Sequence, residues 1–586
     1  MTTVALLQLD PTVGDIASNV AEIERAVTLA ASEGADMAVA SELVVSGYPP
    51  RDMLMDKDFV QRCCDAAHKI NSPIPLMIGC PIPSGKEKSR PYNGVIRVSE
   101  GRKARIVGRK QLLPTYDVFD EGRYFQADDT PGIDRSLPGL SVGITICEDA
   151  WQHAGEVPAD YGSDPIEQLA AWQHQGEPLA LTVNLSSSPY HLAKEGVRAK
   201  IARKAAQTLE HPFLLCNQVG GNDDLLFDGR SLIAFPDGTV VQAPGWCQGV
   251  FLVDLDDPAG ARWLPWPDGE CGDGCRCSVQ MVGEGELPLM PPIGADLLCA
   301  ITVGLGDYCR KSGIERMVLG MSGGIDSAVC AAVACRAVGA ENVLGLAMPS
   351  RYSSIHSLRD AKATADALGM EFQTISIADL HTAAEAALAY ELDPNGSTEG
   401  GAIAGEMIAR PGAEVAAENV QARLRGMLIM AAANSRNSMA LATGNKSELA
   451  MGYCTLYGDM CGGYAPLGDL YKKEVYDLAH AINADAESMG NPPPITESTL
   501  TKPPSAELAP DQTDQDSLPP YEILDEILED FIERNIRNTN HPAELVDSIL
   551  ARLHANEHKR WQMPPAPRVS NRAFGQGWRQ PLASRR

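Results

Sequence analysis

Short apolar segments alternate with segments of helical periodicity along most of this chain, and no other feature limits its possible folds as strongly. In the first half, apolar runs of strand length stand at residues 4–9, 37–40, 75–80, 140–147, 179–185 and 212–219. Between some of them, residues 19–31 and 197–209 carry apolar side chains at helical spacing. Because strands that alternate with helices build layered α/β domains, we expect one such domain to end near residue 255.

The alternation is interrupted once and then resumes. Across residues 256–292 the pattern gives way to Pro, Gly, Trp and Cys, which predicts a linker. Beyond it, helices are expected at 295–311 and from Asp326 onward, and strands at 316–321, 343–348 and 372–377. A chain of 586 residues is too long for one hydrophobic core, so we predict two α/β domains, at 1–255 and 293–586.

The net charge of −28 argues against several classes of function. A general nucleic-acid binder or a binder of acidic membranes needs a basic face, so we expect neither partner. Small anionic substrates need only local positive charge. No apolar run approaches the length of a membrane span, and the first ten residues lack the basic-then-apolar form of a signal peptide. We therefore expect a cytoplasmic protein whose partners are small molecules and further copies of itself, as a homo-oligomer.

Fifteen cysteines are scattered along the chain, an odd number without a compact disulfide framework. In a chain of this size they are typical of reduced thiols in a cytosol. Cys271, Cys275 and Cys277 stand close together, as the ligands of a zinc site would. No second pair of ligands follows at the spacing of a zinc finger, so we favour a Gly-rich connector that carries thiols.

Charge is distributed unevenly near the C-terminal end. Residues 511–533 hold nine acidic and no basic side chains, and their apolar positions share one helical face, which indicates a solvated face on an amphipathic helix. Nothing after Glu557 is acidic, and this stretch carries Lys559, Arg560, Arg568, Arg572, Arg579, Arg585 and Arg586. A basic tail on an acidic protein needs an anionic neighbour, either a ligand or another part of the protein or its assembly.

The strongest local motif is Gly-Met-Ser-Gly-Gly-Ile-Asp-Ser at residues 320–327, between an expected strand and an expected helix. Adjacent glycines let the backbone approach an anion closely, and amides at a helix N-terminus point towards it. Asp326 adds a carboxylate where a phosphate-bound Mg²⁺ would sit. The motif lacks the Gly-Lys-Ser/Thr ending of a Walker loop. The predicted phosphate-binding residues are Gly320, Met321, Ser322, Gly323, Gly324, Ile325, Asp326 and Ser327.

The Ser-Gly-Gly-x-Asp-Ser core of this motif resembles the loop of the ATP pyrophosphatase superfamily, which implies a doubly wound parallel sheet and cleavage of ATP to AMP and pyrophosphate. Further blocks resemble the signature of NAD synthetases. They stand at residues 418–425, 442–448, 453–459, 469–476 and 502–508. The resemblance covers most of 295–586. It implies that ATP, as a co-substrate, activates a carboxylate by adenylation before a nitrogen nucleophile displaces AMP.

The same resemblance implies roles for single residues. Thr443, Lys472 and Ser505 would contact ATP, and Glu448 would join Asp326 at Mg²⁺. The deamidated dinucleotide would be held by Asn419, Arg423, Glu448, Asp459 and Lys559. Taken singly, each of these residue types is common on any protein surface, so the prediction depends on the motifs that contain them.

Three segments of the first half carry the chemistry of amide hydrolysis. We expect Glu42 and Lys110 each to follow an apolar strand, and Cys147 stands where another expected strand ends. Strand ends are where side chains converge on a cleft in layered α/β domains. A thiol that attacks an amide needs a base to take its proton and a cation to stabilise the oxyanion. Glu42, Lys110 and Cys147 supply these three groups without histidine.

Together these residues resemble the catalytic triad of the nitrilase superfamily, and the run at 114–125 is similar to that of NAD synthetase glutaminase domains. The resemblance covers about 1–255 and implies a four-layer α-β-β-α sandwich. It makes Glu42 the base, Lys110 the oxyanion stabiliser and Cys147 the nucleophile. The glutamine pocket would be lined by Tyr116, Glu148, Ser188 and Lys194. Ala193 replaces a glycine frequent in such domains, and the stretch between Trp151 and Leu179 has no assigned role.

The motifs together predict a glutamine-dependent amidotransferase that amidates a nicotinate dinucleotide. Another ATP-pyrophosphatase amidotransferase is the nearest alternative. Asparagine synthetases use an N-terminal cysteine, whereas Thr2 follows Met1 here, and GMP synthetases use a Cys-His-Glu glutaminase that is not apparent. A binding protein with two decayed sites is the alternative from another class, and the complete triad and phosphate loop argue against it.

Overall fold

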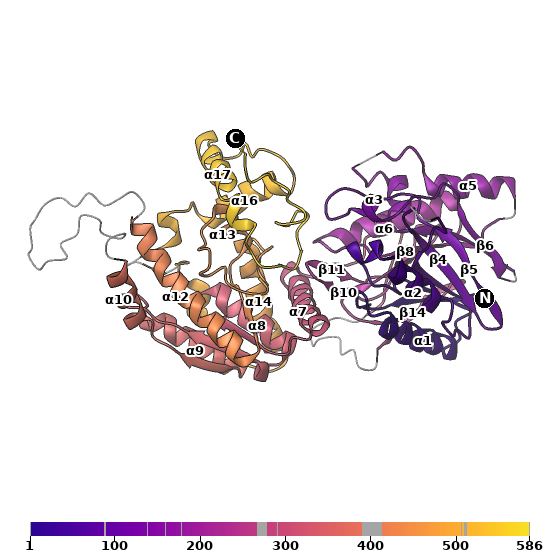
Figure 1. The fold of residues 1–586 in the computed structure, drawn as a ribbon. Coiled ribbons are helices and arrows are strands. Elements are labelled where there is room, and N and C mark those ends of the chain that lie inside the picture. The colour runs from indigo at the N-terminus through magenta and orange to yellow at the C-terminus, as the bar shows by residue number, and fades with distance from the viewer. Residues whose placement is uncertain are drawn as a thin grey trace, which may run out of the picture. The chain divides into compact units, whose positions relative to one another are not determined.

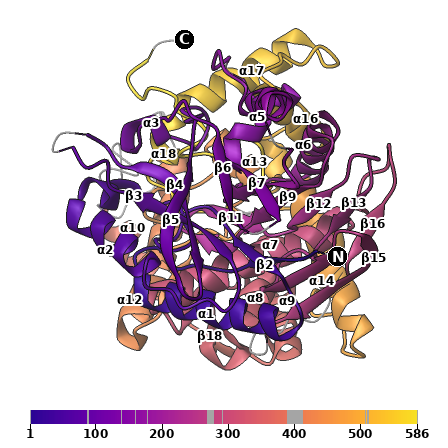
Figure 2. The ribbon, with the colours of Figure 1, turned by 90° about the vertical axis from the view of Figure 1, so that its right-hand side faces the viewer.

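The computed structural model describes residues 2–86, 89–137, 139–158, 160–176, 178–266, 278–289, 291–388, 413–505, 507–508 and 512–584. The chain divides into two compact units, Met1–Pro291 and Pro292–Arg586 (Figure 1). Figure 2 shows the strands of the first unit in the foreground. Cys271, Cys275 and Cys277 lie outside the described residues, so the choice between a zinc site and a connector stays open. Arg585 and Arg586 also lie outside them. No helix in the described ranges has the length and apolarity needed to cross a membrane.

Two seven-stranded sheets form the centre of the first unit. The first sheet has the order β15-β14-β1-β2-β3-β4-β5. Its strands are β1 (Thr3–Gln8), β2 (Met37–Ala40), β3 (Leu76–Ile82), β4 (Tyr92–Ser99), β5 (Arg102–Arg109), β14 (Gly249–Asp254) and β15 (Asp257–Pro265). Pairing is parallel from β1 to β3 and antiparallel in the other pairs of this sheet.

The second sheet has the order β16-β13-β12-β9-β8-β7-β6 and is parallel from β7 to β9. Its strands are β6 (Gly132–Leu137), β7 (Leu140–Ile146), β8 (Leu181–Ser186), β9 (Phe213–Asn217), β12 (Leu232–Ala234), β13 (Val240–Gln242) and β16 (Gln280–Val282). A separate hairpin consists of β10 (Val219–Asn222) and β11 (Leu225–Asp228).

Alternation along β1 shows how the layers form. Val4 and Leu6 lie in a core with residues of the second sheet, whereas Ala5 and Leu7 lie in a core with α1 (Ile16–Ser32) and α2 (Lys57–Ala67). Successive side chains of a strand point to opposite faces, so a strand buried on both faces is apolar throughout. A third core joins α5 (Pro165–Gln175) and α6 (Lys194–Leu209) to the second sheet. The predicted α-β-β-α sandwich is confirmed.

The structure differs from the linker expected over 256–292. Within it, β15 pairs with β14 and β16 pairs with β13, so these two segments are edge strands of the first unit. Trp266 is buried in the core beside α1 and α2. Edge strands tolerate Pro, Gly and irregular exposure because only one side is paired. The apolar alternation is therefore weak there.

The second unit has a parallel four-stranded sheet of order β19-β18-β17-β20. Its strands are β17 (Met317–Gly320), β18 (Val343–Ala347), β19 (Glu371–Thr374) and β20 (Met439–Leu441). Helices that contact the sheet include α8 (Ile325–Val338), α9 (Ile355–Leu368) and α12 (Ala413–Arg436). β18 lies on one side of β17 and β20 on the other. The strand order therefore reverses at β17, where open α/β sheets bind ligands.

A helical layer completes the second unit. Its helices are α13 (Lys446–Met451), α16 (Tyr521–Ile532), α17 (Ala543–Ala555) and α18 (Glu557–Arg560). α13, α16 and α17 share a core that includes Phe574 and Trp578 from the C-terminal tail, and α18 contacts α13 and α17. Leu524, Ile527 and Leu528 of α16 are buried in it, as the amphipathic pattern of the acidic segment predicted. Two longer helices, α7 (Ile293–Ser312) and α14 (Lys472–Ser488), pack together and against α8.

Candidate active sites

Three strand ends of the first unit bring the predicted triad together. Glu42 follows β2, Lys110 follows β5, and Cys147 follows β7 of the other sheet. The Lys110 Nζ lies 2.8 Å from Glu42 Oε1, and both side chains are fully buried. Cys147 is buried and has a φ of 43°, a strained conformation that holds the thiol at a sharp turn.

The electrostatics of this centre are dominated by burial. Burial raises the pKa of the Cys147 thiol, and the Glu42 carboxylate raises it further, while Lys110 acts in the opposite direction. Burial alone would lower the pKa of Lys110, but Glu121 and Glu42 together raise it well above its usual value. The thiol is therefore protonated at rest, the lysine is a permanent cation, and a base is required before the sulfur can attack.

Glu121 is a fourth member of the centre that the sequence reasoning missed. Its Oε1 accepts from Lys110 Nζ at 2.8 Å and from the Tyr48 hydroxyl at 3.1 Å. Burial raises the pKa of Glu121 to about 7 against the lowering effect of Lys110. The residue lies within the 114–125 run, so the resemblance marked the segment but not the side chain.

The four residues predicted to bind glutamine lie beside this centre, and one further residue joins them. The Glu148 carboxylate accepts from Tyr116 at 2.9 Å and from Tyr161 at 2.9 Å. Tyr161 belongs to the stretch between Trp151 and Leu179 that had no assigned role, and a lone tyrosine there gave no signal. Ser188 Oγ is buried and has no hydrogen-bond partner among the described residues. Lys194 Nζ donates to Pro189 O at 2.6 Å.

Ala193 stands where similar domains frequently have glycine, and its backbone conformation shows why glycine suits this position. It is the residue before α6 and has a φ of 68°, in the left-handed region. Glycine adopts this conformation freely, whereas a residue with a Cβ is strained there. The loop therefore keeps the backbone that a glycine would favour, at the cost of local strain.

A cavity of about 300 Å³ lies at the end of β17 in the second unit. Seven of the eight predicted loop residues line it, all except Gly323. Gly323 has a φ of 78°, and a Cβ there would lie 2.1 Å from Ser357 O, so this position requires glycine. Thr443, Lys472 and Ser505, predicted to contact ATP, also line the cavity.

The two carboxylates predicted to bind metal meet at Lys472. Its Nζ lies 2.6 Å from Asp326 Oδ2 and 3.3 Å from Glu448 Oε1. Asn445, which caps α13, donates to Asp326 Oδ1 at 2.9 Å. Burial raises the pKa of Glu448 to about 8, and the negative charge of Asp326 contributes to the same shift. Close carboxylates that repel each other are a donor set that fits a divalent cation.

The residues predicted to hold the dinucleotide converge on the loop 452–459. Asp459 lines the cavity. Lys559 Nζ donates to Gly452 O and Cys454 O, each at 2.7 Å. Asn419 Oδ1 accepts from Thr455 Oγ1 at 2.6 Å, and Arg423 Nε donates to Leu456 O at 3.3 Å. The described residues that line the cavity do not include Asn419, Arg423 or Lys559. These three side chains contact the loop 452–459 instead.

Comparison with known proteins assigns the family. A family model of NAD synthase matches residues 297–564, and one of carbon-nitrogen hydrolases matches residues 3–263. A glutamine-dependent NAD(+) synthetase of Synechocystis sp. is 38% identical over 100% of this chain and 99% of its own. The chain belongs to the glutamine-dependent NAD(+) synthetases. It is therefore a ligase that uses glutamine as amido donor, as the motifs predicted.

Two other similarities extend over the whole synthetase. The glutamine-dependent NAD(+) synthetase of Thermotoga maritima is 36% identical over 99% of this chain and 98% of its own. A solved structure of the Acinetobacter baumannii glutamine-dependent NAD+ synthetase in complex with ADP is 30% identical, with a TM-score of 0.70, over 99% of this chain and 98% of that one. The predicted alternatives, another amidotransferase or a binding protein with decayed sites, are set aside.

Proposed function

We propose that the first unit hydrolyses the side-chain amide of glutamine at Cys147. Glu42 takes the thiol proton as Sγ attacks the amide carbon, and Lys110 donates to the oxyanion that forms. Collapse of the adduct expels ammonia with the proton from Glu42 and leaves a thioester. Water, deprotonated by Glu42, then attacks the thioester, which releases glutamate and restores the thiol. The observation that carries this proposal is the buried contact between Lys110 and Glu42 beside Cys147.

The polar groups beside the triad support an amino acid as substrate. Glu148, oriented by Tyr116 and Tyr161, would receive the α-ammonium group of glutamine. Ser188 Oγ, buried and without a partner among the described residues, would bond the ligand, and Lys194 would face its α-carboxylate. Under this proposal Tyr161 gives the stretch between Trp151 and Leu179 its role.

In the second unit, the backbone of 320–327 would receive the phosphates of ATP, and Thr443, Lys472 and Ser505 would complete that site. Asp326 and Glu448 would hold Mg²⁺, which when bound neutralises charge on the phosphates. Their convergence on Lys472 supports this assignment, as does the pKa of Glu448, which burial and the charge of Asp326 raise. Lys472 would then lie between the carboxylates and the nucleotide.

The second substrate in this proposal is deamido-NAD. An oxygen of its nicotinate carboxylate attacks the α-phosphorus of ATP, and pyrophosphate leaves. Ammonia then attacks the acyl carbon of the adenylate, AMP leaves with the bonding electrons, and the loss of a proton gives the amide of NAD. Asp459 would contact the dinucleotide together with Glu448, and Asn419, Arg423 and Lys559 would hold the loop that presents Asp459.

Transfer of nitrogen tests the whole sequence of steps. Glutamine labelled with ¹⁵N in its amide, supplied with ATP, Mg²⁺ and deamido-NAD, is expected to give NAD labelled in the carboxamide and one AMP per NAD. Mass spectrometry of the NAD and chromatography of the nucleotides measure both. Unlabelled NAD would contradict the glutaminase assignment, and ADP in place of AMP would contradict adenylation.

We further propose that the enzyme works in the cytoplasm as a homo-oligomer, with small-molecule partners and neither nucleic acid nor membrane. The cysteines of the described residues are free thiols, which suits a reducing compartment. Met427 and Met430, one turn apart on α12, are exposed, which suits a subunit contact. Sedimentation of the purified protein would test the assembly, and a monomer at working concentration would contradict it.

A further inference from the structure

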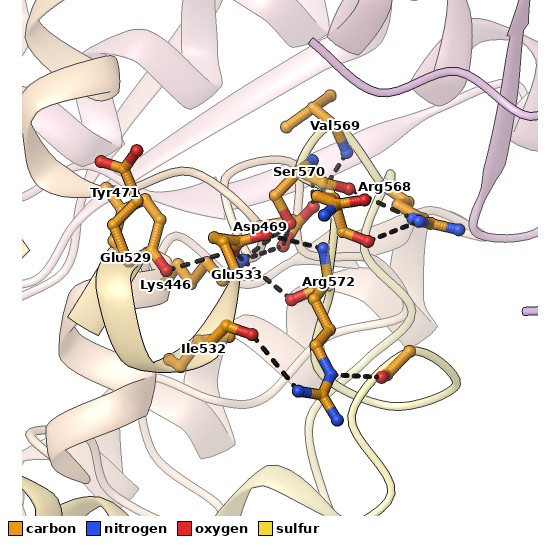
Figure 3. Close-up of polar contacts among 12 residues, drawn as sticks. Lys446, Asp469, Tyr471, Glu529, Ile532, Glu533, Arg568, Val569, Ser570 and Arg572 are labelled. Atoms are coloured by element: carbon orange, nitrogen blue, oxygen red, sulfur yellow. Dashed lines mark hydrogen bonds and ion pairs between the residues drawn. The ribbon is translucent and has the colours of Figure 1, made fainter. Parts of the chain in front are cut away.

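Lys446, the first residue of α13, is a fully buried cation that the mechanism above does not use. Its Nζ contacts Asp469 Oδ1 at 2.9 Å, Glu533 Oε1, Ser570 Oγ at 2.7 Å and Arg572 O at 3.1 Å (Figure 3). A buried charge is tolerated only where partners satisfy it. Because these partners come from separate segments, the ammonium group ties those segments together.

The same two carboxylates hold the C-terminal segment 568–578, which we call the C-terminal clamp. Asp469 accepts from the backbone amides of Val569 and Ser570 at 2.8 Å each and from Ser570 Oγ at 2.8 Å. Glu533 Oε2 accepts from the Arg572 amide at 2.7 Å. The clamp is thus fixed largely through main-chain groups. Glu533 is the last residue of the acidic segment 511–533, so part of the anionic neighbour expected for the basic tail lies in the same chain.

Lys446 also lies between two residues that hold the adenylation site. On one side, Asn445 Oδ1 accepts from the Glu448 amide at 3.0 Å while its Nδ2 donates to Asp326. On the other, Ser447 Oγ accepts from the Lys472 amide at 3.0 Å and donates to Asp525. The Lys446 amide donates to Leu470 O at 2.8 Å, two residues before Lys472. The N-termini of α13 and α14 are therefore fixed relative to each other at Lys446.

We propose that the C-terminal clamp positions Glu448 and Lys472 for adenylation, acting through Lys446. Neither Lys446 nor any clamp residue is among the described residues that line the cavity, so the clamp acts at a distance from the substrates. Groups that bind a nucleotide must be held within a fraction of an ångström of their working geometry, and the residues behind them supply that rigidity. This inference rests on the proposed roles of Glu448 and Lys472.

Ser570→Ala is the mildest way to loosen the clamp, because it removes one hydroxyl that contacts both Lys446 and Asp469. We expect roughly a three- to tenfold rise in the Kd of ATP measured by calorimetry and a similar loss of ammonia-dependent kcat, as for loss of one buried hydrogen bond. Glutamine hydrolysis is expected to stay unchanged. Lys473→Met is the matched control, since Lys473 neighbours Lys472 but its side chain pairs with Glu529 outside the clamp.

Lys446→Met, which keeps the length of the side chain without its charge, is expected to have the larger effect. If the clamp acts through Lys446, adding Ser570→Ala to Lys446→Met should change the Kd of ATP little further, because the two residues belong to one network. Should Lys446→Met fail to fold, the Ser570→Ala result alone decides.

The inference is overturned if Ser570→Ala lowers the melting temperature while the Kd of ATP and kcat match those of the parent, because the clamp would then be structural only. Glu448→Ala and Lys472→Ala separate this outcome from failure of the proposed site. If those two variants bind and use ATP normally, the site assignment itself is wrong. If they lose activity while Ser570→Ala does not, only the positioning role of the clamp fails.

Discussion

Each unit of this protein places a buried lysine between two carboxylates, and the two arrangements differ in what surrounds them. Lys110 lies between Glu42 and Glu121, where the exposed fractions of the two carboxylate side chains are 0% and 6%. Lys472 lies between Asp326 and Glu448, whose side chains are 19% and 16% exposed and line a cavity. The first group surrounds a buried thiol in a closed site, which suits a small substrate. The second borders a cavity, which suits the proposed nucleotide.

The chemistry follows from this difference. In the closed centre a fixed cation can stabilise an oxyanion without a metal, since low polarity strengthens each interaction. In the open centre Glu448 and Asp326 share one ammonium group, and the pKa of Glu448 is raised to about 8, so a divalent cation would favour the ionised form of both carboxylates. A lysine between two carboxylates is therefore proposed to serve amide hydrolysis in one unit and phosphate chemistry in the other.

Of the changes proposed here, Cys147→Ala is expected to have the largest effect. It should abolish the glutaminase activity of the first unit and leave the activity of the second unit unchanged. Synthesis of NAD from glutamine should be abolished, while synthesis from a high concentration of ammonium salt should persist, because only the nitrogen source depends on the thioester. Assays with both nitrogen sources measure this. A variant that still used glutamine would show that another cysteine is the nucleophile.

Asp326→Ala is expected to break the open centre. Synthesis from glutamine and from ammonia should both be lost, with a fold that stays stable, because the change removes a proposed Mg²⁺ ligand at the edge of a cavity and leaves core packing intact. Activity with each nitrogen source, titration with Mg²⁺ and a melting curve together test it. Ammonia-dependent activity with normal dependence on Mg²⁺ would contradict the assignment.

Lys559→Ala is expected to weaken binding of deamido-NAD by about 1–3 kcal/mol, the cost of losing hydrogen bonds from a charged donor. The ammonium group bonds Gly452 O and Cys454 O, so its loss should loosen the loop that carries Asp459. Titration of the dinucleotide at several salt concentrations measures the affinity, and glutamine hydrolysis is the internal control. Unchanged affinity with a lowered melting temperature would make Lys559 structural and remove it from the site.

Much of both units could be predicted from the sequence because buried strands are apolar on both faces. The strand at residues 4–9 was predictable for this reason, and the loop at 320–327 was predictable from its glycines. Edge strands were the weak point. The apolar strand expected before Lys110 is wrong: that strand, β5, reads Arg-Lys-Ala-Arg-Ile-Val-Gly-Arg, and its first residues are exposed, so no apolar run marks it.

The missed site residues have a different cause. Glu121 and Tyr161 act on Lys110 and Glu148 from segments whose own sequences show no periodic or spaced pattern. Their roles depend on how the chain returns to the strand ends, which is tertiary information. Conversely, Asn419, Arg423 and Lys559 were assigned from motifs. In the structure they contact the loop at 452–459 and are not among the described residues that line the cavity.

The pH dependence of stability gives the finest comparison of the two centres. Glu121 and Glu448 each have a pKa raised by burial above the usual value near 4.5, to about 7 and about 8 respectively. Because the folded state then holds a proton that the unfolded state has lost, each group lowers stability as the pH rises above 4.5. That loss should level off near pH 7 for Glu121 and near pH 8 for Glu448.

Glu121→Gln and Glu448→Gln remove these titrations one at a time, and melting curves between pH 5 and pH 9 compare them with the parent. The difference in melting temperature, variant minus parent, should increase with pH up to about 7 for Glu121→Gln and up to about 8 for Glu448→Gln. We expect shifts of a few degrees, the smallest effect of this series. Saturating ATP with Mg²⁺ should alter only the Glu448 profile, since cations at the open centre favour the ionised carboxylate. If the melting temperature of each variant differed from that of the parent by the same amount at every pH, with or without nucleotide, neither carboxyl would bind an extra proton in the folded protein.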